Sequence, residues 1–231
     1  YKPSARPRRP SLRPKRRPLR TLATLETKGF GLSDYIVWVD CEMTGLEVTI
    51  DEICEIGVVV TDGELNVVDP GLQLVIKPSA KALKNMGDFV RQMHTDSGLI
   101  EEIPKGISMA KAEKQVLEYI KQWVPEERTA PLAGNSIGTD RMFLNRQMPA
   151  LDRFLHYRNI DVSSLKELSR RWFPRVYFQL PKKTGNHRAL ADILESIQEL
   201  RYYRKAILVP APGPDSETAK GIANSLSADR I

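Results

Sequence analysis

Hydrophobic residues first gather in three short runs in the first third of the chain. The runs at 35–40, 53–61 and 72–77 are rich in valine and isoleucine, which is typical of buried strands. Turn-forming residues fill 62–66, between the second run and the third. The pattern therefore predicts three consecutive strands arranged as an antiparallel meander.

Further along the chain the spacing of apolar residues becomes helical. Residues 108–124 carry an apolar residue at every third or fourth position, which predicts an amphipathic helix. A longer helix is expected at 189–206. Its predicted apolar face consists of Leu190, Ile193, Leu194, Ile197 and Leu200.

Shorter signals lie between these two helices. Short strands are expected at 131–135 and 158–162, and a helix at 139–147. Ser164 and Glu167 have the spacing of a capping box, so a further helix is expected to begin there. Strands followed by alternating helices and strands predict an α/β fold, with one mixed sheet flanked by helices.

The two ends of the chain differ in composition from this middle part. Residues 1–33 hold ten Lys or Arg, five Pro and a single Glu, so they are expected to be disordered. An RNA-tethering arm, a targeting presequence and a plain solvated extension all remain open. Residues 208–231 begin Pro- and Ser-rich and are expected to be a peripheral tail, which leaves 34–207 as the folded domain.

Net charge, cysteine content and hydropathy argue against a long basic groove, a disulfide or zinc framework, and a membrane span. The net charge is +6, but the first 33 residues contribute +9, which leaves −3 for the rest. A mildly acidic domain does not offer a long basic groove to nucleic acid. Cys41 and Cys54 give neither a disulfide framework nor a zinc motif, and we expect them to be buried and reduced. No apolar stretch approaches the ~20 residues that cross a bilayer.

Two carboxylates close the first predicted strand. Asp40 and Glu42 are two residues apart, so they project from one face while Cys41 points away. Like charges this close either take up a proton or share a cation. Two isolated carboxylates of this kind most often mark a solvated strand end. A cation site is therefore expected only if further acidic residues converge on them.

Three residues elsewhere supply that support. Asp140 follows a short strand at the start of a helix, His187 precedes the last long helix, and Asp192 lies about one turn inside it. Convergent carboxylates suit Mg²⁺ or Mn²⁺, and two such ions ~4 Å apart assist an in-line phosphoryl displacement. A histidine with a pKa near ~6.5 can deprotonate the attacking water.

With these residues in place the chain resembles the DEDDh class of 3′–5′ exonucleases, and within it the oligoribonuclease family. The similarity covers about residues 35–205 and rests on WVDCEMTGL, GNSIGTDRMFL, HYRNIDVSSLKELSRRWFP and KKTGNHRALADI. The end of the chain is most similar to actinobacterial members, which favours a cytoplasmic location. The resemblance implies an RNase H-like fold, a homodimer, and hydrolysis of very short RNAs to 5′-mononucleotides.

The resemblance also implies roles for individual residues. Two divalent cations would be held by Asp40, Glu42, Asp140 and Asp192, with His187 as the general base. Leu46 would wedge against a base, and His94 would lie at the edge of the site. Phe89 replaces the tryptophan usual in the family and offers a smaller stacking face. The 5′ phosphate would be capped by Ser136, Arg158, Ser163 and Ser164, with Tyr157 and Arg158 supplied by a partner subunit.

Each supporting residue also has a simpler interpretation. Ser163 and Ser164 could cap the following helix, Tyr157 and Leu46 could be core residues, and His94 could be structural. Arg158 could be an ordinary surface charge. The three tryptophans, Trp38, Trp123 and Trp172, are expected in the core.

Two other functions stay open at the level of sequence. One is another DEDDh activity, such as proofreading or tRNA trimming, although a trimming enzyme should carry a basic patch for the RNA body. The other is a non-catalytic RNA-binding protein that uses its Arg/Pro-rich extension. Removal of residues 1–33 would separate the last possibility from an exonuclease, because dinucleotide cleavage should survive it.

Overall fold

The computed structural model describes residues 33–182 and 187–228, so almost all of the basic extension lies outside the described residues. Five strands form one sheet in the order β3–β2–β1–β4–β5. β2 pairs antiparallel with both β1 and β3, which confirms the predicted meander, and β4 runs parallel to both β1 and β5. The strands are β1 (Tyr35–Met43), β2 (Ile53–Asp62), β3 (Leu72–Val75), β4 (Pro131–Gly134) and β5 (His156–Asp161).

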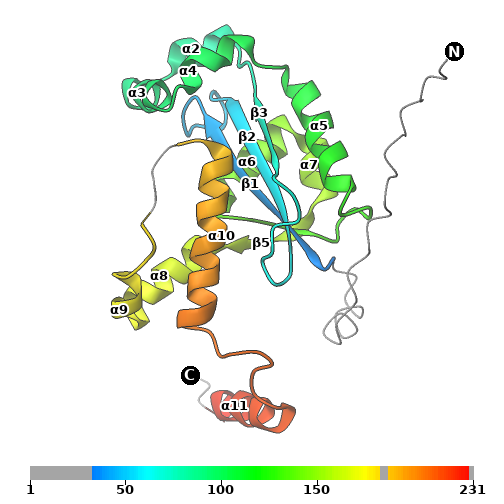
Figure 1. Cartoon of the computed structure of the whole chain (residues 1–231), viewed down its shortest axis with the longest axis vertical. Helices are drawn as coiled ribbons and strands as arrows, with labels where there is room; N and C mark the ends of the chain where they lie inside the picture. The colour runs from blue at the N-terminus through cyan, green and yellow to red at the C-terminus, as the bar shows by residue number, and fades with distance from the viewer. Residues whose placement is uncertain (1–32, 183–186, 229–231) are drawn as a thin grey trace, which may run out of the picture. The chain divides into compact units, whose positions relative to one another are not determined.

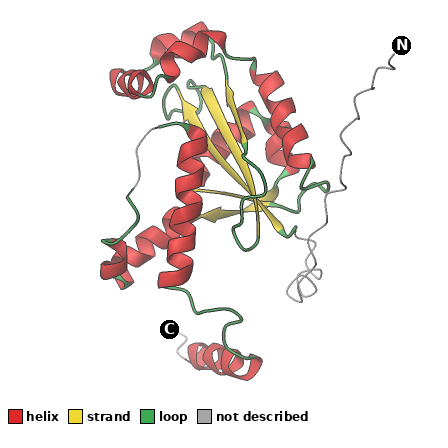
Figure 2. Ribbon diagram, viewed as in Figure 1, coloured by secondary structure: helices red, strands yellow, loops and turns green. Residues whose placement is uncertain are grey.

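Helices cover both faces of this sheet (Figures 1 and 2). Alternate residues of β1 enter different cores, as the period of two requires. Val37 and Val39 pack in one core with α5 (Met109–Lys121), α6 (Ile137–Gln147) and α7 (Pro149–Phe154). Trp38 enters the other core, which is built with α8 (Val162–Trp172) and α10 (Ala189–Ala206).

Short helices fill the segment between β3 and α5. They are α2 (Ala80–Asn85), α3 (Asp88–Asp96), α4 (Leu99–Glu102) and the 3₁₀ turn η2 (Ile103–Lys105). A third core of Cys54, Met86, Leu99 and Ile103 attaches them to the start of β2. This attachment places α3 and α4 near the end of β1, where the paired carboxylates lie.

Two expectations about helix α8 are wrong. The helix begins at Val162, and its N-cap is Asp161, whose carboxylate accepts a 2.9 Å hydrogen bond from the Ser163 N–H. The predicted capping box at Ser164 is therefore not formed, because an aspartate three residues earlier caps the helix first. Trp172, expected in the core, ends α8 with 64% of its surface exposed, whereas Trp38 is completely buried and Trp123 packs against the first core.

The expected apolar face of α10 needs one correction. Leu194 is 42% exposed, while Ser196 and Glu199 are buried on the same helix. Asn135 accounts for the two buried polar residues, because its amide donates hydrogen bonds to Ser196 Oγ and Glu199 Oε2 and so satisfies them in the interior.

The remaining elements lie toward the C-terminal end. α9 (Pro174–Tyr177) follows α8, and α11 (Ser216–Ala228) is a helix within the segment expected to be a tail. Both Cys41 and Cys54 are buried free thiols, as expected. Within residues 33–182 and 187–228, no helix is long and apolar enough to span a membrane.

Candidate active site

Strand β1 carries the first two candidate ligands on the face that α10 covers. In the pairing with β2, Asp40 lies opposite Gly57 and Glu42 lies opposite Glu55. Cys41 points into the opposite core, as expected. The strand therefore presents both carboxylates toward helix α10.

Asp140 reaches the same place from helix α6. It lies in the first turn of α6, and its Oδ1 accepts a 3.0 Å hydrogen bond from the backbone N–H of Cys41. Burial is the main cause that raises the pKa of Asp140 to about 7. The expected convergence of Asp140 on the end of β1 is thus present in the fold.

The start of α10 completes the cluster. One ligand atom each from Glu42, His187 and Asp192 lie within 4.8 Å of one another. The pKa of Glu42 is raised to about 8, first by burial and then by the charges of Asp192, Glu55 and Asp140. Carboxylate oxygens crowded in this way fit a hard divalent cation, whose charge would offset their repulsion.

His187 lies at the open side of this cluster. The residue is exposed and adopts φ 47°, in the left-handed region that non-glycine residues rarely occupy. It stands two residues before the first residue of α10. Its ring can therefore face the carboxylates and solvent at the same time.

His94 lies behind Glu42 and has no exposed surface. Its Nε2 is 2.8 Å from the Met43 carbonyl oxygen and must donate there, which leaves Nδ1 unprotonated, 3.9 Å from Glu42 Oε2. Burial lowers the pKa of His94. The structure thus agrees with the structural interpretation of His94, whose ring is held by its bond to Met43 at the end of β1.

The serines expected at the 5′ phosphate are brought together. The Ser136 N–H donates to Ser163 Oγ at 2.8 Å and to Asp161 Oδ1 at 3.0 Å, and the two serine hydroxyls are 3.1 Å apart. Ser164 is exposed one residue further along α8. These hydroxyls lie at the adjoining starts of α6 and α8.

The other side chains expected to contact the substrate are on the surface. Leu46, Phe89 and Tyr157 are 76%, 82% and 73% exposed, so Leu46 and Tyr157 are not core residues. Arg158 is also exposed, and its guanidinium carbon lies 5.5 Å from the centre of the Tyr157 ring. Large exposed apolar side chains of this kind are available for contact with a ligand.

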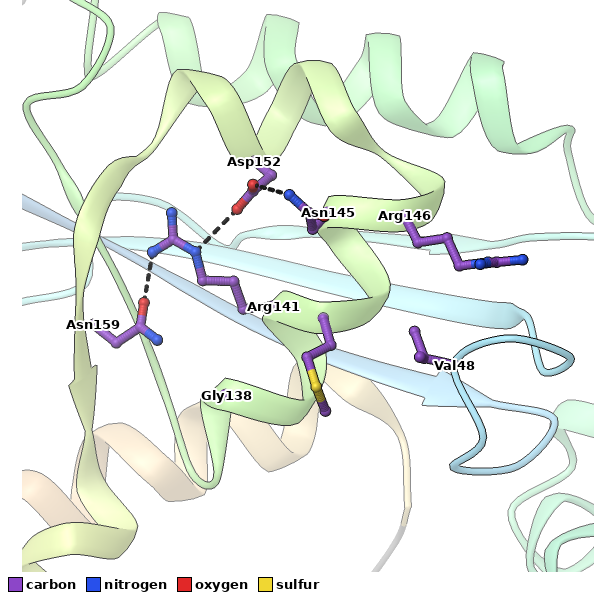
Figure 3. A pocket seen from close by; sticks show the side chains of 8 residues that line it. Val48, Gly138, Arg141, Asn145, Arg146, Asp152 and Asn159 are labelled. Atoms are coloured by element: carbon purple, nitrogen blue, oxygen red, sulfur yellow. Dashed lines mark hydrogen bonds and ion pairs between the residues drawn. The ribbon is translucent and has the colours of Figure 1, made fainter.

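A separate cleft of about 600 Å³ lies along α6 (Figure 3). Arg141 donates to Asp152 Oδ1 at 2.9 Å and to Asn159 Oδ1 at 2.6 Å, and Asn145 donates to Asp152 Oδ2 at 2.8 Å. The residues that line the cleft include none of the candidate metal ligands. The cleft is therefore distinct from the carboxylate cluster.

Sequence reasoning missed an arginine beside the cluster that forms ion pairs with two glutamates. Arg188 Nη2 lies 2.8 Å from Glu55 Oε1, and Arg188 Nη1 lies 3.0 Å from Glu102 Oε1. The available signal was a glutamate inside the apolar run of β2, where a charge is rarely found without a partner.

Known proteins are similar to this chain over most of its length. Residues 37–200 match the family model described as Exonuclease. The chain is 64% identical to an oligoribonuclease of Leifsonia xyli, covering 84% of this chain and 94% of the relative. It is 59% identical to one of Streptomyces avermitilis (83% and 96% covered) and 52% identical to one of Mycobacterium tuberculosis (85% and 92% covered).

Solved structures show the same fold at much lower identity. Exonuclease I of Methylocaldum szegediense has a TM-score of 0.58 and 17% identity over 76% of this chain. A zinc-bound complex of E. coli exonuclease I with single-stranded DNA has a TM-score of 0.61 and 13% identity, also over 76% of this chain. The chain spans 41% of the length of each of these proteins. This similarity of fold confirms the expected RNase H-like architecture.

Proposed function

The chain belongs to the oligoribonuclease family of exonucleases, and from this premise we propose that it removes nucleotides from the 3′ end of very short RNAs. The proposed substrates are 5′-phosphorylated oligoribonucleotides, above all dinucleotides, and the products are 5′-mononucleotides. The observation that carries the proposal is the convergence of Glu42, Asp192 and His187 within 4.8 Å. Asp140 supports it from the other side, through its bond to Cys41.

The carboxylates are the proposed holders of two divalent cations, Mg²⁺ or Mn²⁺. Asp40 and Glu42 project from β1, Asp140 from α6 and Asp192 from α10. When bound, the cations would polarise the phosphodiester and stabilise the charge that develops on its oxygens. Burial keeps water away from Glu42 and Asp140, which strengthens every electrostatic interaction that they make.

His187 is the proposed general base. Its ring nitrogen lies within 4.8 Å of the Glu42 and Asp192 oxygens, so it can accept a proton from a water that attacks the phosphorus atom. Because His187 is exposed, the proton can then leave to solvent. The leaving group is the 3′ oxygen of the preceding nucleotide, and the product is a 5′-mononucleotide.

Substrate length would be limited by contacts at both ends of the RNA. Leu46 and Phe89 offer exposed apolar surface for bases. The hydroxyls of Ser136, Ser163 and Ser164 would bind the 5′ phosphate together with Arg158, and a second copy of the chain would supply Arg158 and Tyr157. A site closed at the 5′ phosphate needs no long basic groove, which agrees with the net charge of −3 beyond residue 33.

The first test compares RNAs of two and seven nucleotides, each 5′-phosphorylated, together with a dinucleotide that has a 5′ hydroxyl. We expect rapid cleavage of the phosphorylated dinucleotide in Mn²⁺ or Mg²⁺, slower cleavage of the other two, and none with Asp192→Asn. Equal rates on all three RNAs would agree with nuclease activity but would contradict the proposed 5′-phosphate contact. An active Asp192→Asn protein would contradict the proposed metal site.

The homodimer has its own test, because each site would combine residues of two subunits. Arg158→Ala and Asp192→Asn proteins should each be inactive on the dinucleotide. Mixing them produces dimers in which one site is intact, and activity should return to about a quarter of the wild-type level. No recovery after subunits have demonstrably exchanged would contradict a shared site.

A further inference from the structure

Two glutamates lie directly opposite each other beside the proposed metal site. Glu42 of β1 and Glu55 of β2 are cross-strand partners, and they are 8% and 0% exposed. Like charges in this arrangement destabilise a sheet unless each has a compensating partner. Glu42 belongs to the proposed metal site, so the partner of Glu55 is a separate question.

Arg188 is that partner, and it binds two carboxylates at once. Its Nε and Nη2 lie 3.0 and 2.8 Å from Glu55 Oε1. On its other edge, Nη1 and Nη2 each lie 3.0 Å from one oxygen of Glu102. A planar guanidinium held by two carboxylates has a fixed position and orientation, which a lysine ammonium could not reproduce.

Glu55 also fixes the first residue of helix α10. Its Oε2 accepts a 2.9 Å hydrogen bond from the Ala189 N–H, one of the helix N–H groups that have no partner within the helix. Gly57, two residues along β2, lets the backbone approach, because a Cβ there would lie 2.8 Å from the Ala189 carbonyl carbon. The helix start is therefore seated on β2 opposite Asp40 and Glu42.

Glu102 connects the same arginine to the short helices. It ends α4, which packs through Leu99 against Cys54 of β2. Arg188 thus bridges Glu55 of β2 and Glu102 of α4, immediately before the first residue of α10.

The residue before this arginine is His187, which has left-handed backbone angles. A non-glycine residue in that region is strained, so contacts with neighbouring elements must hold it there. Arg188 is adjacent in sequence and makes four short contacts with two carboxylates.

We propose that Arg188 is a positioning residue. Held by Glu55 and Glu102, it fixes the backbone of His187 so that the histidine ring stays beside Glu42. The inference rests on the proposed role of His187 as general base. It assigns Glu102 a part in the reaction although Glu102 is on a different helix from every proposed ligand. A purely structural ion pair would stabilise the fold without acting through His187.

The test uses Arg188→Lys, which keeps the charge but loses the planar fork, and Glu102→Gln. The matched controls are Arg204→Lys and Glu64→Gln, which alter another Arg–Glu pair that involves the far end of α10. We expect Arg188→Lys to lower kcat by tenfold to a hundredfold, roughly the effect of a small misplacement of a catalytic group, and Glu102→Gln to lower kcat as well. KM and the Mg²⁺ midpoint should stay within about twofold, and both controls should match wild type.

A double variant separates positioning from stability. In His187→Ala, the residual rate in single turnovers with excess enzyme should not fall further when Arg188→Lys is added, because the group that Arg188 positions is gone. Additive losses, or a kcat for Arg188→Lys equal to wild type while His187→Ala is inactive, would overturn this inference alone. Full activity of His187→Ala would instead contradict the role of His187 as general base, and the inference about Arg188 would fail with it.

Discussion

The backbone N–H of Cys41 donates a 3.0 Å hydrogen bond to Asp140 Oδ1, across 99 positions of sequence. The bond joins the first turn of α6 to β1, at the residue between Asp40 and Glu42. It holds the Asp140 carboxylate beside the other two even though like charges repel. The same contact thus serves the fold and the proposed metal site, and substitutions can separate the two roles.

Asp140→Asn should sharply slow hydrolysis and preserve the fold. The amide oxygen can still accept from Cys41, but the lost charge should reduce the rate by about a thousandfold, because cation binding contributes several kcal/mol. Asp140→Ala should also lose about 1–3 kcal/mol of unfolding free energy, since the Cys41 N–H is left buried without its acceptor. Urea unfolding beside dinucleotide hydrolysis measures both. An active Asp140→Asn protein would contradict a role in metal binding.

Gly57→Ala should damage both stability and activity. The new Cβ would meet the backbone of Ala189 and Leu190 at 2.8 and 2.9 Å, which forces α10 away from β2 and costs about 1–3 kcal/mol. Because Asp192 moves with α10, the rate should fall as well. Gly138→Ala is the stability control, since a Cβ there meets nothing within 4 Å and the residue lies in a helix. Equal melting temperatures for the two variants would contradict the close packing at Gly57.

Phe89 provides a test of base stacking that leaves the fold intact. Its side chain is 82% exposed, so Phe89→Ala should change the melting temperature little. If a base stacks on it, KM for the dinucleotide should rise roughly fivefold to a hundredfold, which corresponds to about 1–3 kcal/mol per base. Phe89→Trp should lower KM, because indole has the larger face. Phe178→Ala is the matched control, at another exposed phenylalanine (77%). An effect of the same size in Phe178→Ala would argue against stacking at Phe89.

The periodicity of the sequence was sufficient for the sheet and the long helices. Val- and Ile-rich runs located β1, β2 and β3, and the apolar face of 108–124 located α5. The short helices at residues 80–105 give no usable pattern, because three to nine residues hold too few turns for a helical period to emerge. The prolines at 210, 212 and 214 explain why the segment of α11 is expected to be a tail, because they favour irregular structure just before the helix begins at Ser216.

Burial of individual side chains depended on partners distant in sequence. Leu194 lies on the predicted face of α10 but is exposed, because Asn135 draws Ser196 and Glu199 into the interior. The spacing of the acidic residues and His187 predicted a cluster, and the structure brings Glu42, His187 and Asp192 together. Arg188 and Glu55 are 133 residues apart, and no local pattern relates them.

Removal of divalent cations should make the stability of the protein depend on pH. The pKa values of Glu42 and Asp140 are raised to about 8 and about 7, mainly by burial, from ordinary values of 4.5 and 3.8. Between about pH 4 and pH 8 the folded protein therefore keeps protons that the unfolded chain has released. The unfolding free energy of the metal-free protein must then fall as pH rises through this window.

Cation binding should reverse that trend, because ligands must be deprotonated before they bind a metal. In EDTA the melting temperature should fall from about pH 6 to about pH 8.5, whereas Mg²⁺ should raise it more at the higher pH. Asp140→Asn should weaken the pH dependence, since one of the two groups no longer titrates. Thermal unfolding at both pH values, with EDTA and with Mg²⁺, measures all of this. An equal Mg²⁺ effect at both pH values would mean that Glu42 and Asp140 are already ionised without a cation, so that protons and metal do not compete for them.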